Sequence, residues 1–273
     1  MKFKFSEPAF LLLAFLFLEF SSYAQEIPGE SGPTLRILTY NILHGATTTG
    51  AYDLNQVAQV IRKIDPDITA IQEVDFRTRR SKNLDVATEL AIKTQMVPVF
   101  AKATDYDGGA YGQAILSRWP LVKASTISLP GHPEKEPRIA VEAVIALPSG
   151  DTIQFIGTHL DHVKRDTDRK VQAEAINKLL AKTDHPVILA GDLNDHPGSR
   201  TIGLLESKWT SSYEARDPQP TFPSHSPQKK IEYSMVAPKG RWKVRKAKVF
   251  CNETASDHCA YLVELELLPA INR

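Results

Sequence analysis

Hydrophobic residues recur along the chain with two different periods, and each period predicts a class of secondary structure. Over residues 54–64 the apolar side chains repeat every three or four positions, which is typical of a helix with one buried face. Asp65-Pro66 ends this helix, because the residue before a proline avoids helical backbone angles. The same period predicts further helices over residues 85–93, 166–182 and 198–205.

Shorter runs that are uniformly apolar, or that alternate apolar with polar residues, predict β-strands. They lie at residues 35–40, 68–71, 111–117, 121–127, 139–147, 152–158, 188–191, 231–236, 241–250 and 260–267. Arg118-Trp119-Pro120 separates two of these strands, which we expect to pair as a hairpin, and Ser149-Gly150-Asp151 predicts a second hairpin. Strands that alternate with helices in this way predict an α/β fold.

Polar groups follow several of the predicted strands directly. The apolar run at residues 188–191 ends in a glycine and is followed by Asp192 and Asn194, whose side chains emerge on the same side. Strand ends of α/β sheets often carry catalytic groups, because the sheet fixes the backbone while the tips reach solvent. The other polar groups at or near predicted strand ends are Asn41, Glu73, His159, Glu232, Asp257 and His258. Taken singly, Asn41 suits a turn and His159 suits a structural role.

Basic residues gather in two places, and each has two interpretations. Arg77, Arg79, Arg80 and Lys82 form either a solvated surface or an arm that contacts a substrate phosphate, for which arginine's fork is suited. The strand at 241–250 has no acidic residue, which favours an edge strand protected by charge over a nucleic-acid contact.

The 273 residues, 42% of them hydrophobic, suffice for one domain with a sizeable core. A net charge of +1 provides no overall field that would attract nucleic acid or an anionic membrane. Residues 1–24 combine two lysines, an apolar run of about 10 residues and small residues before a cleavage point after Ala24. They predict a signal peptide, a leader over 25–34, a secreted or periplasmic protein and no stable membrane anchor.

Cys251 and Cys259 are the two cysteines of the chain. Export makes a disulfide between them feasible, and it would hold the intervening segment, which contains His258. Two buried free thiols are the alternative.

In chain order, the strand-end groups and their neighbours resemble the endonuclease/exonuclease/phosphatase superfamily, and the similarity extends to its secreted bacterial branch. The matching segments are Thr39-Tyr40-Asn41, Gln72-Glu73-Val74-Asp75, the eight residues Tyr111 to Arg118, Gly157-Thr158-His159-Leu160-Asp161-His162, Gly191-Asp192-Leu193-Asn194 and Ser256-Asp257-His258. The resemblance implies one domain over residues 35–268 with the DNase I-like α/β fold. In this fold two mixed β-sheets, flanked by helices, form a four-layer α/β/β/α sandwich.

The resemblance also implies a role for each site residue. Glu73, Asn41 and Asp257 are expected to bind Mg²⁺ or Mn²⁺, since hard cations prefer oxygen ligands. Asp192 and Asn194 would orient and activate the attacking water. His159 and His258 would bind the phosphate and transfer protons. Arg80, Arg138 and Asn41 are the expected substrate-binding residues.

One position departs from the family pattern. Glu232 stands where the family carries an aspartate that holds the final histidine, so its carboxylate must reach His258 with one more methylene. We expect the contact to persist with an adjusted geometry.

Substrate choice is not encoded in these motifs, because it depends on the loops. The chain has no long insertion that would probe DNA, which favours a phosphodiester or phosphomonoester of a small-molecule or lipid type. A secreted nuclease acting on DNA or RNA and a non-catalytic extracellular protein that binds a phosphate ligand are the alternatives. We expect a monomer.

Overall fold

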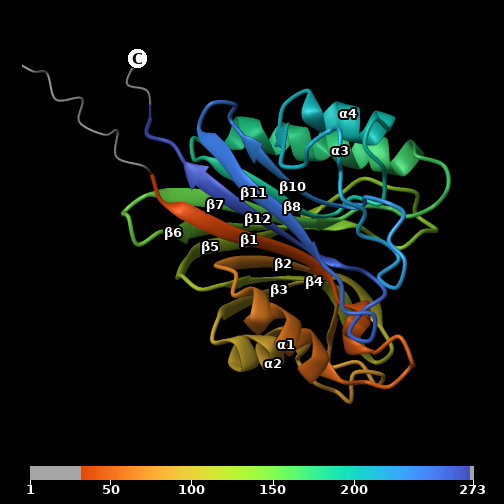
Figure 1. Ribbon diagram of the computed structural model, residues 1–273. Helices are drawn as coiled ribbons and strands as arrows, with labels where there is room; N and C mark the ends of the chain where they lie inside the picture. Colours follow the sequence, from red (N-terminus) through yellow and green to blue (C-terminus); the bar gives the residue numbers. More distant parts are fainter. Residues whose placement is uncertain (1–31, 271–273) are drawn as a thin grey trace, which may run out of the picture. The chain divides into compact units, whose positions relative to one another are not determined.

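The computed structural model describes residues 32–270, which fold into two β-sheets packed face to face (Figure 1). The first sheet contains, in spatial order, β11 (Trp242–Phe250), β12 (Ala260–Leu267), β1 (Thr34–Asn41), β2 (Ile68–Phe76), β4 (Gly109–Ser117) and β3 (Val97–Tyr106). The second contains β5 (Leu121–Ser128), β6 (Ile139–Ala146), β7 (Thr152–His159), β8 (Val187–Asp192), β10 (Glu232–Ala237) and β9 (Thr210–Ser211). Each sheet is mixed, with one parallel pair near its centre, β1 with β2 and β7 with β8.

Helices cover the outer face of each sheet, as Figure 1 shows. On the first sheet lie α1 (Leu54–Ile64) and α2 (Val86–Thr94), and on the second lie α3 (Thr167–Leu179) and α4 (Arg200–Glu206). Two single 3₁₀ turns complete the helical elements, η1 (Leu43–Gly45) and η2 (Leu180–Lys182). The predicted four-layer α/β/β/α sandwich is confirmed.

The main core fills the space between the two sheets. Ile37 and Val263 of the first sheet and Phe155 and Ile188 of the second are all fully buried there. Since burying a side chain of this size contributes roughly 1.5–3 kcal/mol, this layer fixes how the sheets face one another.

The hairpin predicted on either side of residues 118–120 is wrong. β4 and β5 belong to different sheets, and the segment between them carries the chain from one sheet to the other. Arg118 contacts Asp65 and Asp67 at 2.5 and 3.2 Å, while Trp119 packs against the core between the sheets. Arg118-Trp119-Pro120 correctly marked the end of a strand, but this segment does not indicate which strand pairs with β4.

The true partner of β4 is β3, a strand that the hydrophobic pattern did not predict. β3 is the outer strand of its sheet, and most of its side chains are half-buried or exposed, so its apolar alternation is weak. The basic strand β11 occupies the opposite outer position, which confirms the predicted edge strand.

Within residues 32–270, none of the helices combines the length and apolar character needed to cross a membrane. The predicted signal peptide and residues 25–31 of the leader lie outside the described residues.

Gly191, next to Asp192, is required by the spacing of β7 and β8. A Cβ atom at this position would lie 2.0 Å from the carbonyl oxygen of Thr158 on the neighbouring strand. We predict that Gly191→Ala lowers the free energy of unfolding by about 1–3 kcal/mol, the usual cost of overpacking, as measured by urea denaturation. Gly203→Ala is the control, because its Cβ meets nothing within 4 Å and alanine favours the helix. Equal stability of the two variants would contradict the prediction.

Candidate functional site

Three strands of the second sheet end side by side and bring three predicted residues together. Asp192, the last residue of β8, is directly opposite His159 on β7 and Glu232 on β10. His159 Nε2 lies 3.5 Å from Asp192 Oδ2. Asp192 and Glu232 are almost fully buried, so the sheet delivers two carboxylates to an interior position.

The first sheet contributes Asn41 and Glu73. The sequence analysis placed Glu73 after the end of its strand, and this is wrong. Glu73 lies within β2 at a β-bulge, where its backbone is left-handed with φ of 59°. A bulge redirects a side chain, and Glu73 Oε1 thereby accepts a 3.0 Å hydrogen bond from Asn41 Nδ2. The same nitrogen donates to Asp192 Oδ2 at 3.3 Å, which joins the two sheets through one amide.

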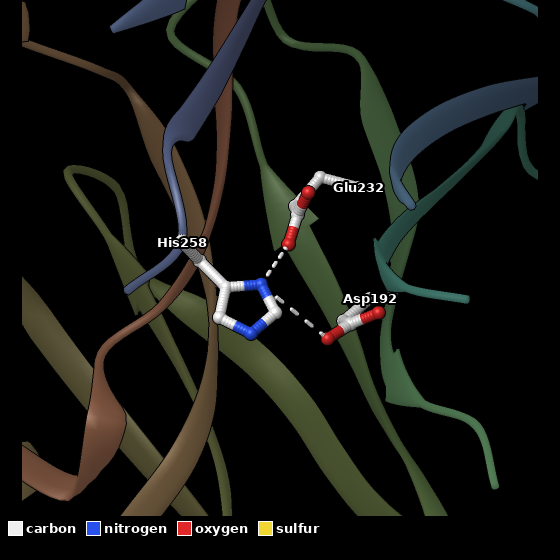
Figure 2. Close-up of side chains that lie close together, drawn as sticks. All are labelled: Asp192, Glu232 and His258. Atoms are coloured by element: carbon white, nitrogen blue, oxygen red, sulfur yellow. Dashed lines mark hydrogen bonds and ion pairs between the residues drawn. The ribbon is translucent and has the colours of Figure 1, made fainter. Parts of the chain in front are cut away.

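His258 completes this group from the loop before β12 (Figure 2). Its Nδ1 lies 2.5 Å from Glu232 Oε1 and 3.7 Å from Asp192 Oδ2. The glutamate at position 232 therefore makes the carboxylate–imidazole contact that we expected of it, despite its extra methylene. In Figure 2 the second ring nitrogen points away from Glu232, and it lies 4.0 Å from Asp257 Oδ1.

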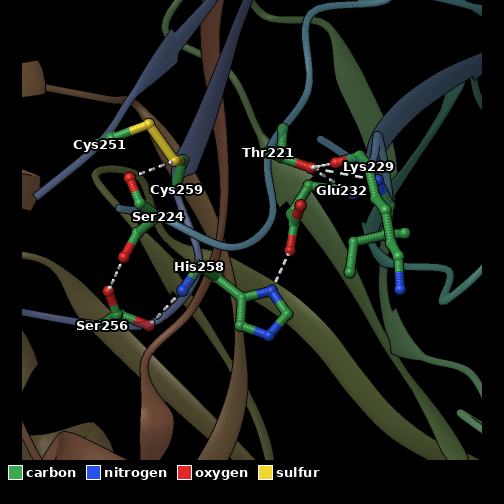
Figure 3. Close-up of a disulfide and its surroundings, with 9 residues drawn as sticks. Thr221, Ser224, Lys229, Glu232, Cys251, Ser256, His258 and Cys259 are labelled. Carbon is green, nitrogen blue, oxygen red and sulfur yellow. Dashed lines mark hydrogen bonds and ion pairs between the residues drawn. A yellow bond between two sulfur atoms is a disulfide. The ribbon is translucent and has the colours of Figure 1, made fainter. Parts of the chain in front are cut away.

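The loop that carries His258 is fixed by two serine hydroxyls (Figure 3). Ser256 Oγ donates to the Asn41 carbonyl at 2.7 Å and accepts from the His258 backbone N–H at 3.1 Å. Ser224 Oγ donates to the Ser256 carbonyl at 2.7 Å. The imidazole is thus positioned relative to both β1 and the loop before β10.

Cys251 and Cys259 form a disulfide, which decides between the two interpretations of these cysteines. Their sequence separation is 8, and His258 precedes the second cysteine. The bond closes a short loop around the 256–258 segment, as Figure 3 shows, and limits how far His258 can move.

The two histidines have opposite protonation tendencies. Burial alone would lower the pKa of His258, but the carboxylates of Glu232, Asp192 and Asp257 raise it to about 10. Burial, followed by the charge of Arg138, lowers the pKa of His159 well below its ordinary value. A charged imidazole and a neutral one therefore flank Asp192, an arrangement that separates proton donor from proton acceptor.

Asp192 itself is held by neighbours on both of its oxygens. Its Oδ1 accepts from the Asn194 backbone N–H at 2.9 Å, while the Asn194 side chain donates to the Leu160 carbonyl at 3.0 Å. Burial, with the nearby Glu232 carboxylate, raises the pKa of Asp192 above its ordinary value. A carboxylate with a raised pKa is a better proton acceptor near neutral pH.

Oxygen ligands for a divalent cation lie on the first-sheet side of the site. Burial would raise the pKa of Glu73, but His44, Asn41 and the charge of His258 lower it below its ordinary value, so its carboxylate stays ionised. Asp257 Oδ1 is buried without a hydrogen bond among the described residues and lies 4.0 Å from His258 Nε2. These two carboxylates fit Mg²⁺ or Mn²⁺, which take oxygen ligands.

A second group, Asp192, Glu232 and His258, also has potential metal ligands, all within 4.8 Å of one another. Its nitrogen ligand would come from His258, whose Nδ1 is hydrogen-bonded to Glu232 at 2.5 Å. Hard cations prefer oxygen ligands, so Glu73, Asn41 and Asp257 fit Mg²⁺ or Mn²⁺ better.

The two predicted arginines lie at the margin of the site. Arg138 is buried, and its Nη2 is 3.1 Å from His162 Nδ1. Arg80 uses its fork within the protein, since Nε and Nη2 donate to the Asp75 carboxylate at 2.7 and 2.8 Å. Its guanidinium also lies over the Tyr106 ring, 4.4 Å from the centroid. Phosphate binding by Arg80 stays a prediction.

Sequence reasoning missed Tyr111 as a site residue. Burial is the main cause that raises its pKa, followed by the charges of Glu73 and Glu136. The guanidinium of Arg80 lies 5.5 Å from its ring centroid. Its place in the Tyr111–Arg118 motif was the available signal, but nothing in that motif indicates a nearby carboxylate.

Comparison with known proteins places this geometry in context. The model of the Endonuclease/Exonuclease/phosphatase family matches residues 38–258. An endonuclease/exonuclease/phosphatase from Bacteroides vulgatus is 19% identical, with a TM-score of 0.71 over 86% of this chain and 99% of that one. The human Nocturnin catalytic domain, with a bound sulfate anion, is 20% identical, with a TM-score of 0.70 over 86% and 95%. A mannosyl-6-phosphatase from Bacteroides thetaiotaomicron is 20% identical, with a TM-score of 0.66 over 85% and 99%.

The raised pKa of His258 predicts a specific pH dependence in the metal-free protein. Replacing Glu232 by glutamine removes the main attracting charge, so the His258 pKa should fall from about 10 by one unit or more, measured by NMR titration. A histidine whose pKa is raised in the folded state stabilises the fold, and this contribution is complete at pH values below the ordinary pKa of 6.5. The stability advantage over Glu232→Gln should therefore be full below pH 6.5 and shrink as pH rises toward about 10.

Glu253→Gln is the control, because Glu253 is an exposed carboxylate five residues from His258. It should leave the His258 titration unchanged. If His258 titrates near pH 6.5 in the unaltered protein, the assignment of a charged imidazole is wrong.

Proposed function

We propose that the chain, which belongs to the endonuclease/exonuclease/phosphatase family of phosphate-ester hydrolases, is a divalent-metal-dependent phosphoesterase. It acts by in-line attack of water on a phosphodiester or phosphomonoester of a small-molecule or lipid type. The observation that supports this activity most directly is the buried Asp192 carboxylate, with a neutral His159 on one side and a charged His258 on the other.

Glu73, Asp257 and Asn41 are the residues that would hold Mg²⁺ or Mn²⁺. When bound, such a cation polarises the phosphoryl oxygens and neutralises charge on the leaving oxygen. The ionised carboxylate of Glu73 supports this assignment, and so does Asp257 Oδ1, which has no hydrogen bond among the described residues.

The proton transfers belong to residues of the chain. Asp192 accepts the proton of the attacking water, and its raised pKa favours that step. Asn41 fixes the Asp192 carboxylate from the first sheet, and the backbone of Asn194 fixes it from the second. Glu232 keeps His258 charged and oriented, so that the imidazolium stabilises the negative phosphoryl group as it forms.

We also propose that the protein is exported. The Cys251–Cys259 disulfide supports this, because disulfides persist in oxidising compartments and are rare where thiols are kept reduced.

Removing either central group should abolish turnover while the fold survives. We predict that Asp192→Ala and His258→Ala each lower kcat by at least about 10²–10⁴, because each removes a proton acceptor or a charge that stabilises the transition state. The assay is Mg²⁺-dependent release of phosphate or alcohol from a panel of phosphate esters, beside circular dichroism. Asp184→Ala, an exposed carboxylate before β8, is the control. Full turnover by both variants would rule out this site.

Metal binding can be tested without turnover. Mg²⁺ or Mn²⁺ should raise the melting temperature of the intact protein, since a ligand that binds only the folded state stabilises it. Glu73→Gln removes a ligand charge and should lose this increase, and EDTA should reverse it in the intact protein. An equal increase in the melting temperature of Glu73→Gln would show that the cation binds elsewhere. The first candidate would then be the group of Asp192, Glu232 and His258.

A further inference from the structure

We propose that the organic part of the substrate is a single polyol or sugar unit, held by a cavity with charged and apolar lining residues near the end of β7, which carries His159. This inference rests on the phosphoesterase activity proposed above. The cavity has a volume of about 150 Å³ and lies between the loop from Leu129 to Arg138 and the start of α3. The lining residues that matter here are Gly131, Lys135, Arg138, Asp161, Asp168 and Gln172.

Two lining residues connect the cavity with the catalytic group. Asp161 follows His159 by two residues, and Arg138 contacts His162 through Nη2 at 3.1 Å. Arg138 directly precedes β6, and Ala140 of β6 is paired with Thr158, the residue before His159, so Arg138 and His159 lie at the same edge of the second sheet. A phosphate bound at His159 would therefore place its ester substituent within reach of this cavity.

Arg138 has an unused donor. Its side chain is 4% exposed, Nη1 contacts Glu136 at 3.1 Å and Nη2 contacts His162. Nε has no hydrogen-bond partner within residues 32–270. Leaving a buried charged donor unsatisfied is costly, and the same side chain lines the cavity, so we take Arg138 as the residue that would meet an oxygen atom of a ligand.

Charged acceptors and a charged donor also line the cavity. Asp161 and Asp168 are 3% and 8% exposed, and Lys135 Nζ lies between them, 3.4 Å from Asp161 Oδ2 and 2.7 Å from Asp168 Oδ2. A hydroxyl group both donates and accepts hydrogen bonds. Carboxylates next to an ammonium and a guanidinium therefore suit the neighbouring hydroxyls of a polyol.

The same features disfavour other ester groups. The volume is below the range of roughly 300–1,000 Å³ that is typical of sites for drug-sized ligands, so a whole nucleoside fits poorly. The lining has no phenylalanine, tyrosine or tryptophan on which a base could stack. An acyl chain would have to displace water from charged groups without replacing its hydrogen bonds.

Gly131 offers a way to fill the cavity without altering the catalytic residues. A Cβ atom here would lie 3.5 Å from Gln172 Nε2 and 3.9 Å from Asp168 Oδ2, which is ordinary contact. The larger side chain of Gly131→Leu would extend into the cavity. Gly203→Leu is the matched control, an exposed glycine on α4 with nothing within 4 Å of its Cβ. Asp168→Asn is a second variant, which keeps the volume but removes one acceptor charge.

The experiment measures kcat/KM with Mg²⁺ for glucose 6-phosphate, glycerol 3-phosphate and 4-nitrophenyl phosphate, the last of which has no hydroxyl on its organic group. Gly131→Leu and Asp168→Asn should lower kcat/KM for the two polyol esters by about tenfold or more, within the range that pocket contacts can discriminate. Turnover of 4-nitrophenyl phosphate should change by less than about twofold, and Gly203→Leu should change neither. An equal loss on all three esters, or turnover of a nucleotide or phospholipid but of no polyol ester, would overturn the inference.

A binding measurement without turnover tests this inference separately from the proposed activity. Glucose 6-phosphate should raise the melting temperature of the unaltered protein and not that of Gly131→Leu. If no ester is turned over while this shift is seen, the phosphoesterase proposal fails and the cavity assignment stands. If esters are hydrolysed but the shift is absent, or is the same in Gly131→Leu, the cavity assignment fails alone.

Discussion

The burial of the Asp192 carboxylate is the constraint on which the rest of the site depends. A charge removed from water is tolerated only if hydrogen bonds and opposite charges replace the solvent. Here the replacements come from both sheets, through the amide of Asn41, the backbone of Asn194 and the imidazole of His258. The ends of β1, β7, β8 and β10 must therefore meet at one point, and this requirement explains why the polar residues at those ends cannot be exchanged independently.

Much of this arrangement could be predicted from the sequence. Hydrophobic periods located α1 and most strands, because each period reports a buried face that is local in the chain. The polar residues after those strands identified the site, with Asn41, Asp192 and His258 among them. The predictions that failed depend on contacts between distant parts of the chain. The hairpin across residues 118–120 was wrong because the sequence does not show which sheet each strand joins. β3 was missed because an edge strand has no fully buried face.

The site itself shows the same limit. Glu73 was found, but its position in a bulge was not, because a positive φ at a non-glycine residue leaves no mark in the hydrophobic pattern. Tyr111 was overlooked as a site residue because its relevance lies in the charged groups that the fold brings near it, Glu73 and Arg80. Glu232 is the reverse case. The sequence showed an unusual residue, and only the register of β10 with β8 explains how its longer side chain still reaches His258.

The division of the site between two sheets makes the interior of the protein part of its catalytic apparatus. Asn41 belongs to one layer and Asp192 to the other, and their 3.3 Å contact is only as constant as the stacking of those layers. Ile37 and Phe155, which touch no substrate, set that stacking. Because a misplacement of about 1 Å can reduce a rate by about 10²-fold, a small change of shape in this core would alter turnover as well as stability. Evolution of the rate in such a fold can thus proceed through hydrophobic residues that never meet the reactants.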